Sequence, residues 1–202
     1  MSASAGNAIS TSELVIGQPY GGGFFIGIIR DPVTGLEYRQ ISAGVELELR
    51  GKWGEYGVKI AGADSFIDGR ANTEAMAAAG SDLAKQVLAL GDGWAIPARD
   101  QQELQYRHLK PTTDENYCWN RDGDNPHSVP VGTLYTEHYP AQTAIEVFKS
   151  GGKEAFRPRY YWSSSQRSAD FAFNLNFAVG DQSSHDKSGE CFVRPVRSEL
   201  IQ

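Results

Sequence analysis

The residues best suited to bind a ligand gather in the C-terminal quarter of the chain. Apolar side chains at every second position of 171–177 predict a strand that buries one face. The opposite face and its flanking turns carry amide, hydroxyl and charged groups, whose directional hydrogen bonds suit sugars or a wet protein interface. The candidate ligand-binding residues are Arg167, Asp170, Asn174, Asn176, Asp181, Gln182, Ser184 and His185. A plain solvated strand and loop is the alternative interpretation.

A second candidate is the run of side-chain oxygens at 120–125, which reads Asn-Arg-Asp-Gly-Asp-Asn. Asp122, Asp124 and Asn125 surround a glycine and offer the hard oxygen ligands that calcium prefers. The full EF-hand spacing and its distal glutamate are missing, and most such runs are Asx turns. We therefore predict no cofactor and keep calcium at this loop as the alternative.

The remaining reactive side chains form no recognisable catalytic set. The four histidines are scattered, with no pair four residues apart, and no G-x-S-x-G elbow surrounds the serines after Trp162. Gly21–Gly23 lacks the Gly-Lys-Ser/Thr of a P-loop. Cys118 and Cys191 form no CxxC motif. Two thiols, at least partly buried, are expected in a reducing compartment, and a disulfide between them is the alternative.

Composition excludes several classes of protein. A chain of 202 residues suits one medium domain, and its net charge of −6 argues against the basic surface of a nucleic-acid-binding protein. The longest apolar run, 24–29, is too short to cross a bilayer. The first ten residues lack a basic start and an apolar region, so we expect no secretory signal. Residues 1–18 are predicted to be a flexible arm, and 19–202 a single domain.

The pattern of apolar residues and turns predicts an α+β fold, with strands first, helices in the middle and a β-meander last. The first strands are expected at 24–29, 36–41 and 45–49, the first two forming a hairpin around the turn 31–35. A helix over 73–90 takes Asn72 as N-cap, and Asp100 caps a second helix with Glu103 in the reciprocal position. A capping box at 143–146 predicts a short third helix. The last strands are expected at 160–164, 171–177 and 191–197. Aromatic residues in the long loop between the second and third helices predict that it packs down and is ordered.

Several motifs, taken in order, resemble a known family. Gly91-Asp-Gly-Trp-Ala-Ile-Pro-Ala-Arg-Asp100, followed by Glu103-Leu104, is similar to the core of the Lcl C-terminal-like domains, bacterial and phage modules with a C-type-lectin-like fold. Tyr161-Trp-Ser-Ser-Ser165 and Phe192-Val-Arg-Pro-Val-Arg197 resemble the end of these domains. The segments 21–25, 109–116, 125–130 and 142–156 resemble its phage branch. The resemblance spans about residues 20–198, and Ala98 departs from the usual Ser or Thr.

The resemblance implies a C-type-lectin-like fold with a variable, loop-rich surface that binds glycans or proteins in related proteins. We therefore expect a phage virion surface protein, such as a tail fibre, tail tip or baseplate component, that attaches to a host-cell receptor. A structural virion subunit, either a decoration or a spacer, is the alternative. The formylglycine-generating oxidases share this fold but need two close cysteines, so no enzymatic activity is expected. By analogy with fibres we expect a homo-oligomer, with a trimer as first choice, that contacts other virion proteins. We expect no nucleic-acid partner and no insertion into a membrane.

Overall fold

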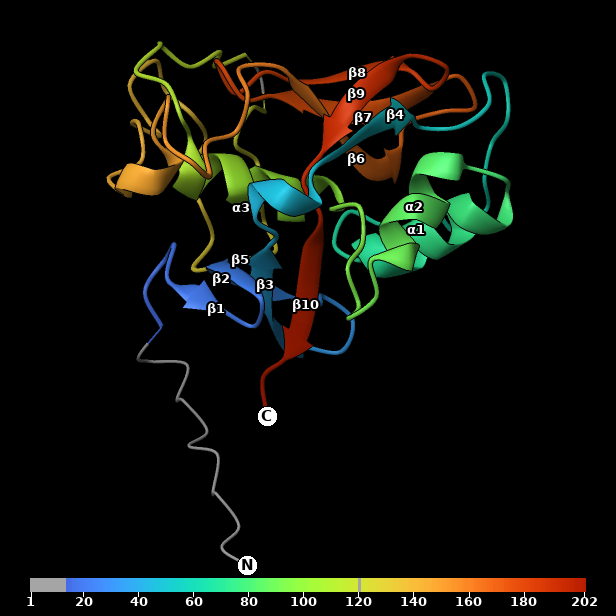
Figure 1. Ribbon diagram of the computed structural model, residues 1–202, viewed down its shortest axis with the longest axis horizontal. Coiled ribbons are helices and arrows are strands. Elements are labelled where there is room, and N and C mark those ends of the chain that lie inside the picture. Colours follow the sequence, from blue (N-terminus) through green and yellow to red (C-terminus); the bar gives the residue numbers. More distant parts are fainter. Residues whose placement is uncertain (1–13, 120) are drawn as a thin grey trace, which may run out of the picture.

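The computed structural model describes residues 14–119 and 121–202, so most of the predicted arm, residues 1–13, lies outside the described residues. The described part of the chain is α+β, as predicted, with three α-helices and ten strands in two sheets. In Figure 1 one sheet lies above the other, helix α3 runs between them, and α1 and α2 lie together at one side. None of the described helices combines the length and apolar character needed to span a membrane.

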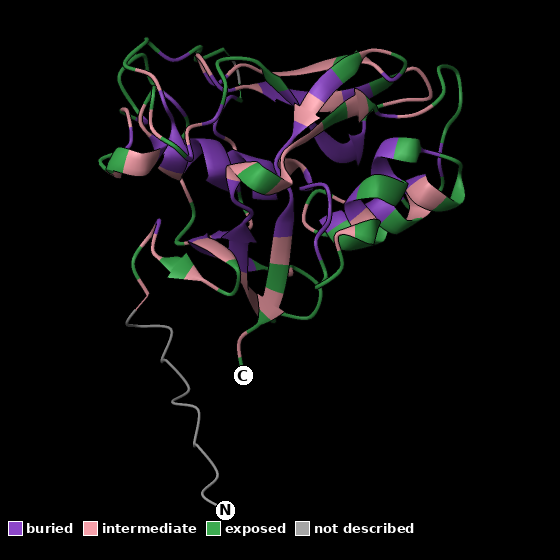
Figure 2. Ribbon diagram, viewed as in Figure 1, coloured by how far each residue is buried: buried purple, intermediate pink, exposed green. Residues whose placement is uncertain are grey.

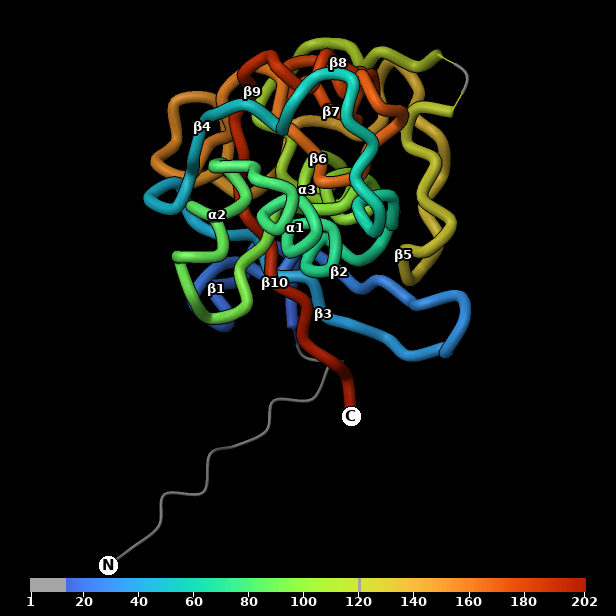
Figure 3. The backbone as a smooth tube through the Cα atoms, turned by 90° about the vertical axis from the view of Figure 1, so that its right-hand side faces the viewer, coloured from blue at the N-terminus to red at the C-terminus, as the bar shows by residue number. Residues whose placement is uncertain are grey.

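The first sheet contains the predicted hairpin. Its strands follow the order β1 (Pro19–Tyr20), β2 (Gly23–Arg30), β3 (Glu37–Ser42) and β10 (Val196–Leu200), and β5 (Ser128–Val129) also pairs with β2. The hairpin turn extends away from the body of the protein in Figure 3. Asp31 shapes this turn because its Oδ1 accepts hydrogen bonds from the backbone N–H groups of Val33 and Thr34. The chain's first hairpin and its last strand therefore form one sheet.

The second sheet contains two of the three strands predicted for the C-terminal meander, β6 (Tyr160–Gln166) and β7 (Phe171–Asn176), and next to β7 a strand that was not predicted, β8 (Gln182–Asp186). Its order is β4-β9-β6-β7-β8, with β4 at Leu49–Lys52 and β9 at Glu190–Val193. The predicted last strand, 191–197, is wrong as a single element. It divides at Arg194-Pro195, where the chain leaves the second sheet as β9 and enters the first as β10, so this short segment links the two sheets.

The predicted strand at 45–49 is also wrong. Residues Val45–Leu47 form a 3-10 turn, η2, and β4 begins only at Leu49. The reason is Glu48, whose carboxylate turns inward and accepts hydrogen bonds from Arg194 Nη2 at 2.7 Å and Tyr161 Oη at 2.8 Å. A half-exposed strand with its acidic residues in solvent would break these buried contacts.

Both faces of the second sheet are covered by core. Tyr161, Leu175 and Phe192 contact a cluster that includes Leu104 and Tyr106 of α3. On the other face, Trp162, Ala172 and Cys191 join a cluster that includes Met76, Leu83 and Val87 of the helix pair α1–α2. Successive residues of β6, β7 and β9 thus enter different cores, as the two-residue period of a strand requires.

The predicted helix 73–90 is two helices, α1 (Gly69–Ala78) and α2 (Asp82–Ala89). Gly80 breaks it at a φ of +103°, and Ser81 begins α2 by accepting a hydrogen bond from the backbone N–H of Ala84. Asp68, not Asn72, caps α1. Asn72 lies inside the helix, buried, with its amide bonded to the backbone of Ser65.

The third predicted helix is a short 3-10 turn, η3 (Glu146–Phe148), preceded by Ile145 and not by a Thr143 cap. The second predicted helix is α3 (Arg99–Leu109), whose residues are almost all buried although most are polar (Figure 2). The buried polar side chains of α3 position the candidate site.

Candidate ligand-binding site

The first turn of α3 buries two carboxylates. Ala98 is the N-cap, and Gln101 Oε1 accepts the hydrogen bond from its backbone N–H at 2.8 Å. The predicted capping pair of Asp100 and Glu103 is therefore wrong. Both side chains point away from the helix end and are buried, where they contact the long loop 110–142.

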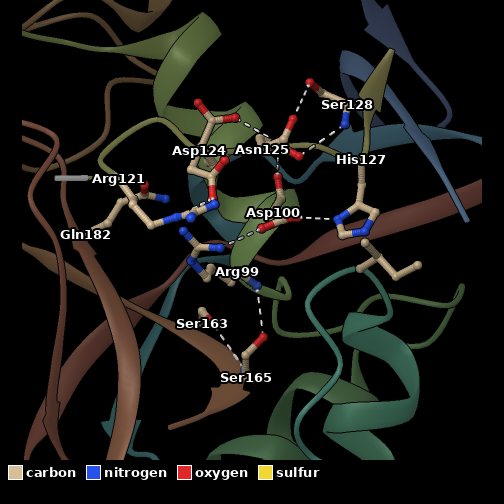
Figure 4. Close-up of polar contacts among 12 residues, drawn as sticks. Arg99, Asp100, Arg121, Asp124, Asn125, His127, Ser128, Ser163, Ser165 and Gln182 are labelled. Carbon is tan, nitrogen blue, oxygen red and sulfur yellow. Dashed lines mark hydrogen bonds and ion pairs between the residues drawn. The ribbon is translucent and has the colours of Figure 1, made fainter. Parts of the chain in front are cut away.

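Asp100 and Glu103 both form hydrogen bonds with that loop, and Figure 4 shows Asp100 beside Asn125 and His127. Asp100 Oδ2 lies 2.6 Å from His127 Nδ1, and its Oδ1 lies 3.4 Å from Arg99 Nη1. Asn125 donates from one amide nitrogen to both residues, at 2.9 Å to the backbone oxygen of Asp100 and 2.8 Å to Glu103 Oε2. The loop is consequently anchored by charge-assisted hydrogen bonds to the helix.

Burial raises the pKa of both carboxyls. For Asp100 the hydrogen bond from His127 and the charge of Arg99 partly oppose this rise. For Glu103 the Arg107 guanidinium and the hydrogen bonds from Asn125 and Tyr135 do the same. The paired positive groups and donors are what make these buried carboxylates tolerable.

Two cations extend the anchoring along the loop. Arg107 donates to the backbone oxygens of Gly123 at 2.8 Å and Thr133 at 2.9 Å. The ammonium of Lys110 donates to Asn116 Oδ1 at 2.8 Å and to the backbone oxygen of Asp114 at 2.5 Å. The described part of the loop contacts α3 mainly through polar groups, and not through the packed aromatic side chains on which the prediction of an ordered loop rested.

An open cleft of about 430 Å³ lies where this loop meets β7 and β8. On one side Tyr117 and Trp119 stack, with ring centroids 6.2 Å apart, and are 45% and 66% exposed. On the other side Phe66 and Phe173 meet edge to face at 5.6 Å. We call this the aromatic cleft; its lining residues are Phe66, Arg99, Tyr117, Trp119, Arg121, Asp122, Phe173, Asp181 and Gln182.

Arg99 links the aromatic cleft to the buried network. Its guanidinium carbon lies 5.1 Å from the centroid of the Phe66 ring and 5.9 Å from that of Phe173, within the range of cation–π attraction. The same guanidinium pairs with buried Asp100. One arginine therefore orients the two phenylalanine rings and is itself fixed by the first turn of α3.

Polar groups fix the floor of the aromatic cleft. Asp122 accepts hydrogen bonds from the backbone N–H groups of Gln182 at 3.3 Å and Trp119 at 3.2 Å, while Gln182 Oε1 accepts one from Gly123 at 2.8 Å. Burial raises the pKa of Asp122 to about 6, and Asp181 adds to the rise, against these backbone donors and Arg99. Loop and β8 are thus tied together at the cleft.

Of the eight predicted ligand-binding residues, two line the aromatic cleft, Asp181 and Gln182. Arg167, in the turn between β6 and β7, donates a hydrogen bond of 2.9 Å to Ser184 on β8. His185 is exposed, and its ring stacks 5.9 Å from that of Trp162. Asp170 is half-buried in the turn before β7, where its backbone oxygen accepts from Lys187. The side chain of Asn176 accepts from the backbone of Ala178 and shapes the next turn.

The predicted orientation of β7 is wrong in its first half. Asn174 is 4% exposed, and Ala172 beside it is fully buried, because that face of the sheet packs toward α1 and α2. Phe171 and Phe173, expected in the core, are exposed and half-buried respectively. Asn174 therefore does not face open solvent, and Phe173 instead supplies an aromatic wall of the cleft.

The calcium candidates do not converge. Asp122 accepts from two backbone groups, Asp124 pairs with Arg121, and Asn125 bonds α3 and the backbone of Ser128. Their oxygens serve separate partners, as in Asx-type turns, and Asn120 lies outside the described residues. The alternative of a disulfide is also wrong, because both cysteines are free, Cys118 exposed and Cys191 buried.

Sequence reasoning missed six residues of the aromatic cleft, Phe66, Arg99, Tyr117, Trp119, Arg121 and Phe173. The loop aromatics Tyr117, Trp119, Tyr135 and Tyr139 were expected to pack inward, yet only Tyr135 is buried. The sequence did contain a signal for these residues, namely large aromatic side chains in a segment rich in Asn, Asp and Gly. Such side chains are either buried in the core or exposed at a binding site, and the second interpretation applies here.

Comparison with models of known protein families finds no match to this chain, and a search of the curated proteins finds none either.

Proposed function

We propose that this protein is a ligand-binding module on the surface of a phage virion, in a tail fibre, tail tip or baseplate, and that it attaches the particle to a host-cell receptor. The receptor would bind at the aromatic cleft. The motifs that resemble the phage branch of the Lcl C-terminal-like domains support the virion setting, and the polar hairpin beside the cleft supports a wide contact surface.

The observation that carries the binding proposal is the exposed, stacked pair of Tyr117 and Trp119. Large apolar side chains held in solvent lose the stabilisation that burial would give them. Tryptophan, tyrosine and arginine are the residues that dominate the energy of binding interfaces. Here they form one wall of a cleft whose other parts supply carboxylates, an amide and two guanidinium groups.

A rigid support under the pair strengthens the argument. The backbone N–H of Trp119 is bonded to Asp122, and the backbone N–H of Tyr117 donates to the oxygen of Val179 at 2.6 Å. The backbone that carries the two rings is therefore held in place before a ligand arrives, which lowers the entropic cost of binding.

We also propose the C-type-lectin-like fold. Two observations support it. The motifs that resemble the Lcl C-terminal-like domains occur in the same order along the chain, and the first hairpin and the last strand pair in one sheet while a long loop is anchored to α3. A binding role without catalysis belongs to the same proposal. The oxidases of this fold use a close pair of reactive cysteines, whereas here the two cysteines are not bonded to each other and one of them, Cys191, is buried.

The test is binding of labelled protein to candidate host cells. We expect saturable binding that Tyr117→Ala/Trp119→Ala abolishes and Tyr56→Ala preserves. Tyr56 is the control because it is also an exposed tyrosine but lies outside the aromatic cleft. Thermal unfolding of each variant shows that the fold is retained.

A second pair of variants separates the aromatic cleft from the hairpin. Arg167→Ala and His185→Ala remove exposed side chains of the β7–β8 region that do not line the cleft. Loss of binding in these alone would move the site to the hairpin. No binding by the assembled protein at micromolar concentration would contradict attachment and favour the structural virion subunit.

A further inference from the structure

Three metal-ligating side chains that the aromatic cleft does not use meet on the long loop. Glu115 comes from one segment of the loop, and Glu137 and His138 come from another more than twenty residues later. One carboxylate oxygen from each glutamate and one ring nitrogen of the histidine all lie within 4.8 Å of one another. All three side chains are exposed, so an ion can reach them from solvent.

The backbone brings these two segments together. Thr136 and Tyr139 exchange backbone hydrogen bonds of 2.9 and 3.1 Å, which places Glu137 and His138 side by side at the tip of a tight turn. The backbone N–H of Asn116 donates to the oxygen of Glu137 at 2.8 Å, so Glu115 is held next to that turn.

Buried groups below the turn fix this arrangement. The Asn116 amide donates to the backbone oxygens of Thr136 and Pro140 at 3.0 Å each. Its Oδ1 accepts from the ammonium of Lys110 and from Tyr106 Oη at 2.7 Å. The two segments that carry the three ligands are therefore joined to α3 by side chains shielded from water, and the ligands start from a defined frame.

The charges at this point are unbalanced. Two carboxylates lie within a few ångströms of each other, and in the described part of the chain neither forms an ion pair with a lysine or arginine. Like charges so close repel each other. The ammonium of Lys110 does not neutralise them, because it donates to the backbone oxygen of Asp114 and to Asn116 Oδ1. A divalent cation between the two carboxylates would relieve their repulsion.

We propose that Glu115, Glu137 and His138 bind a divalent transition-metal ion of the zinc class. One imidazole and two carboxylates are a ligand set that suits zinc, and zinc bonds of about 2.0–2.2 Å place neighbouring ligand atoms about 3.3 Å apart. Small rotations of exposed side chains bring the three atoms to that separation. Three protein ligands leave a coordination position for water or for a group of another molecule.

The consequence would be a clamp across the long loop. A bound ion joins segment 115–117 to segment 136–139, and Tyr117 of the aromatic cleft lies two residues from the first ligand. Metal binding should therefore raise the thermal stability of the loop without contributing a residue to the aromatic cleft itself.

The test is a competition titration of the full chain against a chromogenic zinc chelator. We expect one zinc ion per chain, with affinity reduced at least about tenfold in Glu137→Gln and in His138→Ala. Glu55→Gln and His185→Ala are matched controls, since each removes an exposed side chain of the same type elsewhere, and both should bind zinc like the original protein.

Cobalt provides a readout that depends on the ligands. Addition of Co²⁺ should produce visible absorption bands in the original protein and both controls, and weaker, shifted bands in the two ligand variants. Absence of zinc binding at 1:1 stoichiometry, or equal affinity in ligand variants and controls, would overturn the proposal. Because the three side chains are exposed, circular dichroism should show all variants folded.

Discussion

Asn125→Ala tests whether the long loop is anchored through its polar contacts to α3. Asn125 is 1% exposed, and its amide donates to the backbone oxygen of Asp100 and to Glu103 Oε2 while accepting from the backbone of Ser128. Two ordinary hydrogen bonds contribute about 1 kcal/mol each, and one to a buried carboxylate about 1.5–3 kcal/mol. Partial relaxation of the loop recovers some of this, so we expect the free energy of unfolding to fall by about 3 kcal/mol.

Urea denaturation, monitored by tryptophan fluorescence, measures that change. The slope of the unfolding free energy against urea concentration should be the same in the variant and the original protein, which shows that the same transition is observed. Asp124→Ala is the control one residue away. Its partner Arg121 has a side chain 77% exposed, so loss of that ion pair should cost less than about 1 kcal/mol. If Asn125→Ala also costs less than about 1 kcal/mol, the loop is held by something other than its contacts to α3, and the anchoring argument fails.

Three further results are expected. Asp122 has a pKa raised from 3.8 to about 6, so the native state binds its proton more tightly and stability should fall as pH rises between those values. The full shift corresponds to a loss of about 3 kcal/mol in the free energy of unfolding, and screening by solvent at the cleft reduces the expected loss to about 1–2 kcal/mol. Asp122→Asn should abolish this pH dependence of stability. Gly180→Ala should cost about 2 kcal/mol more in thermal unfolding than Gly151→Ala: both glycines have positive φ, but only at Gly180 would a Cβ meet a side chain, 2.5 Å away. A thiol reagent should label Cys118 in the native protein and Cys191, whose pKa burial raises to about 11, only after unfolding, as mass spectrometry would show.

Local patterns predicted the elements whose partners lie nearby in sequence. The hairpin around Asp31 and the strands β6 and β7 follow from turn residues and a two-residue apolar period, and these elements are confirmed. The break at Gly80 could have been predicted in the same way, because a glycine often ends a helix and a serine directly after it often caps the start of the next one. The apolar stripe continued across the break, which made two helices resemble one.

The candidate site is formed by contacts between residues that are far apart in the sequence, and the sequence pattern did not predict these contacts. Asp100 has the right spacing to Glu103 for a capping box, yet burial against His127 and Asn125 determines its orientation. Asn174 alternates with phenylalanines as a solvent-facing residue does, but the second sheet has core on both faces. The local sequence pattern predicts which residues of a strand share a face, but it does not predict whether one face or both faces of the sheet are buried.

The anchors of the long loop carry a consequence for how its surface can change. Arg107 and Lys110 bond mainly to backbone oxygens of the loop, at Gly123, Thr133, Asp114 and Pro140. Every amino acid has such an oxygen, so substitutions at most exposed loop positions leave these contacts intact. Exposed side chains such as those of Tyr117 and Trp119 could therefore be exchanged over generations at little cost in stability, whereas Asp122 and Gln182 tie the loop to β8 and are constrained. One scaffold would in this way have access to many different binding specificities.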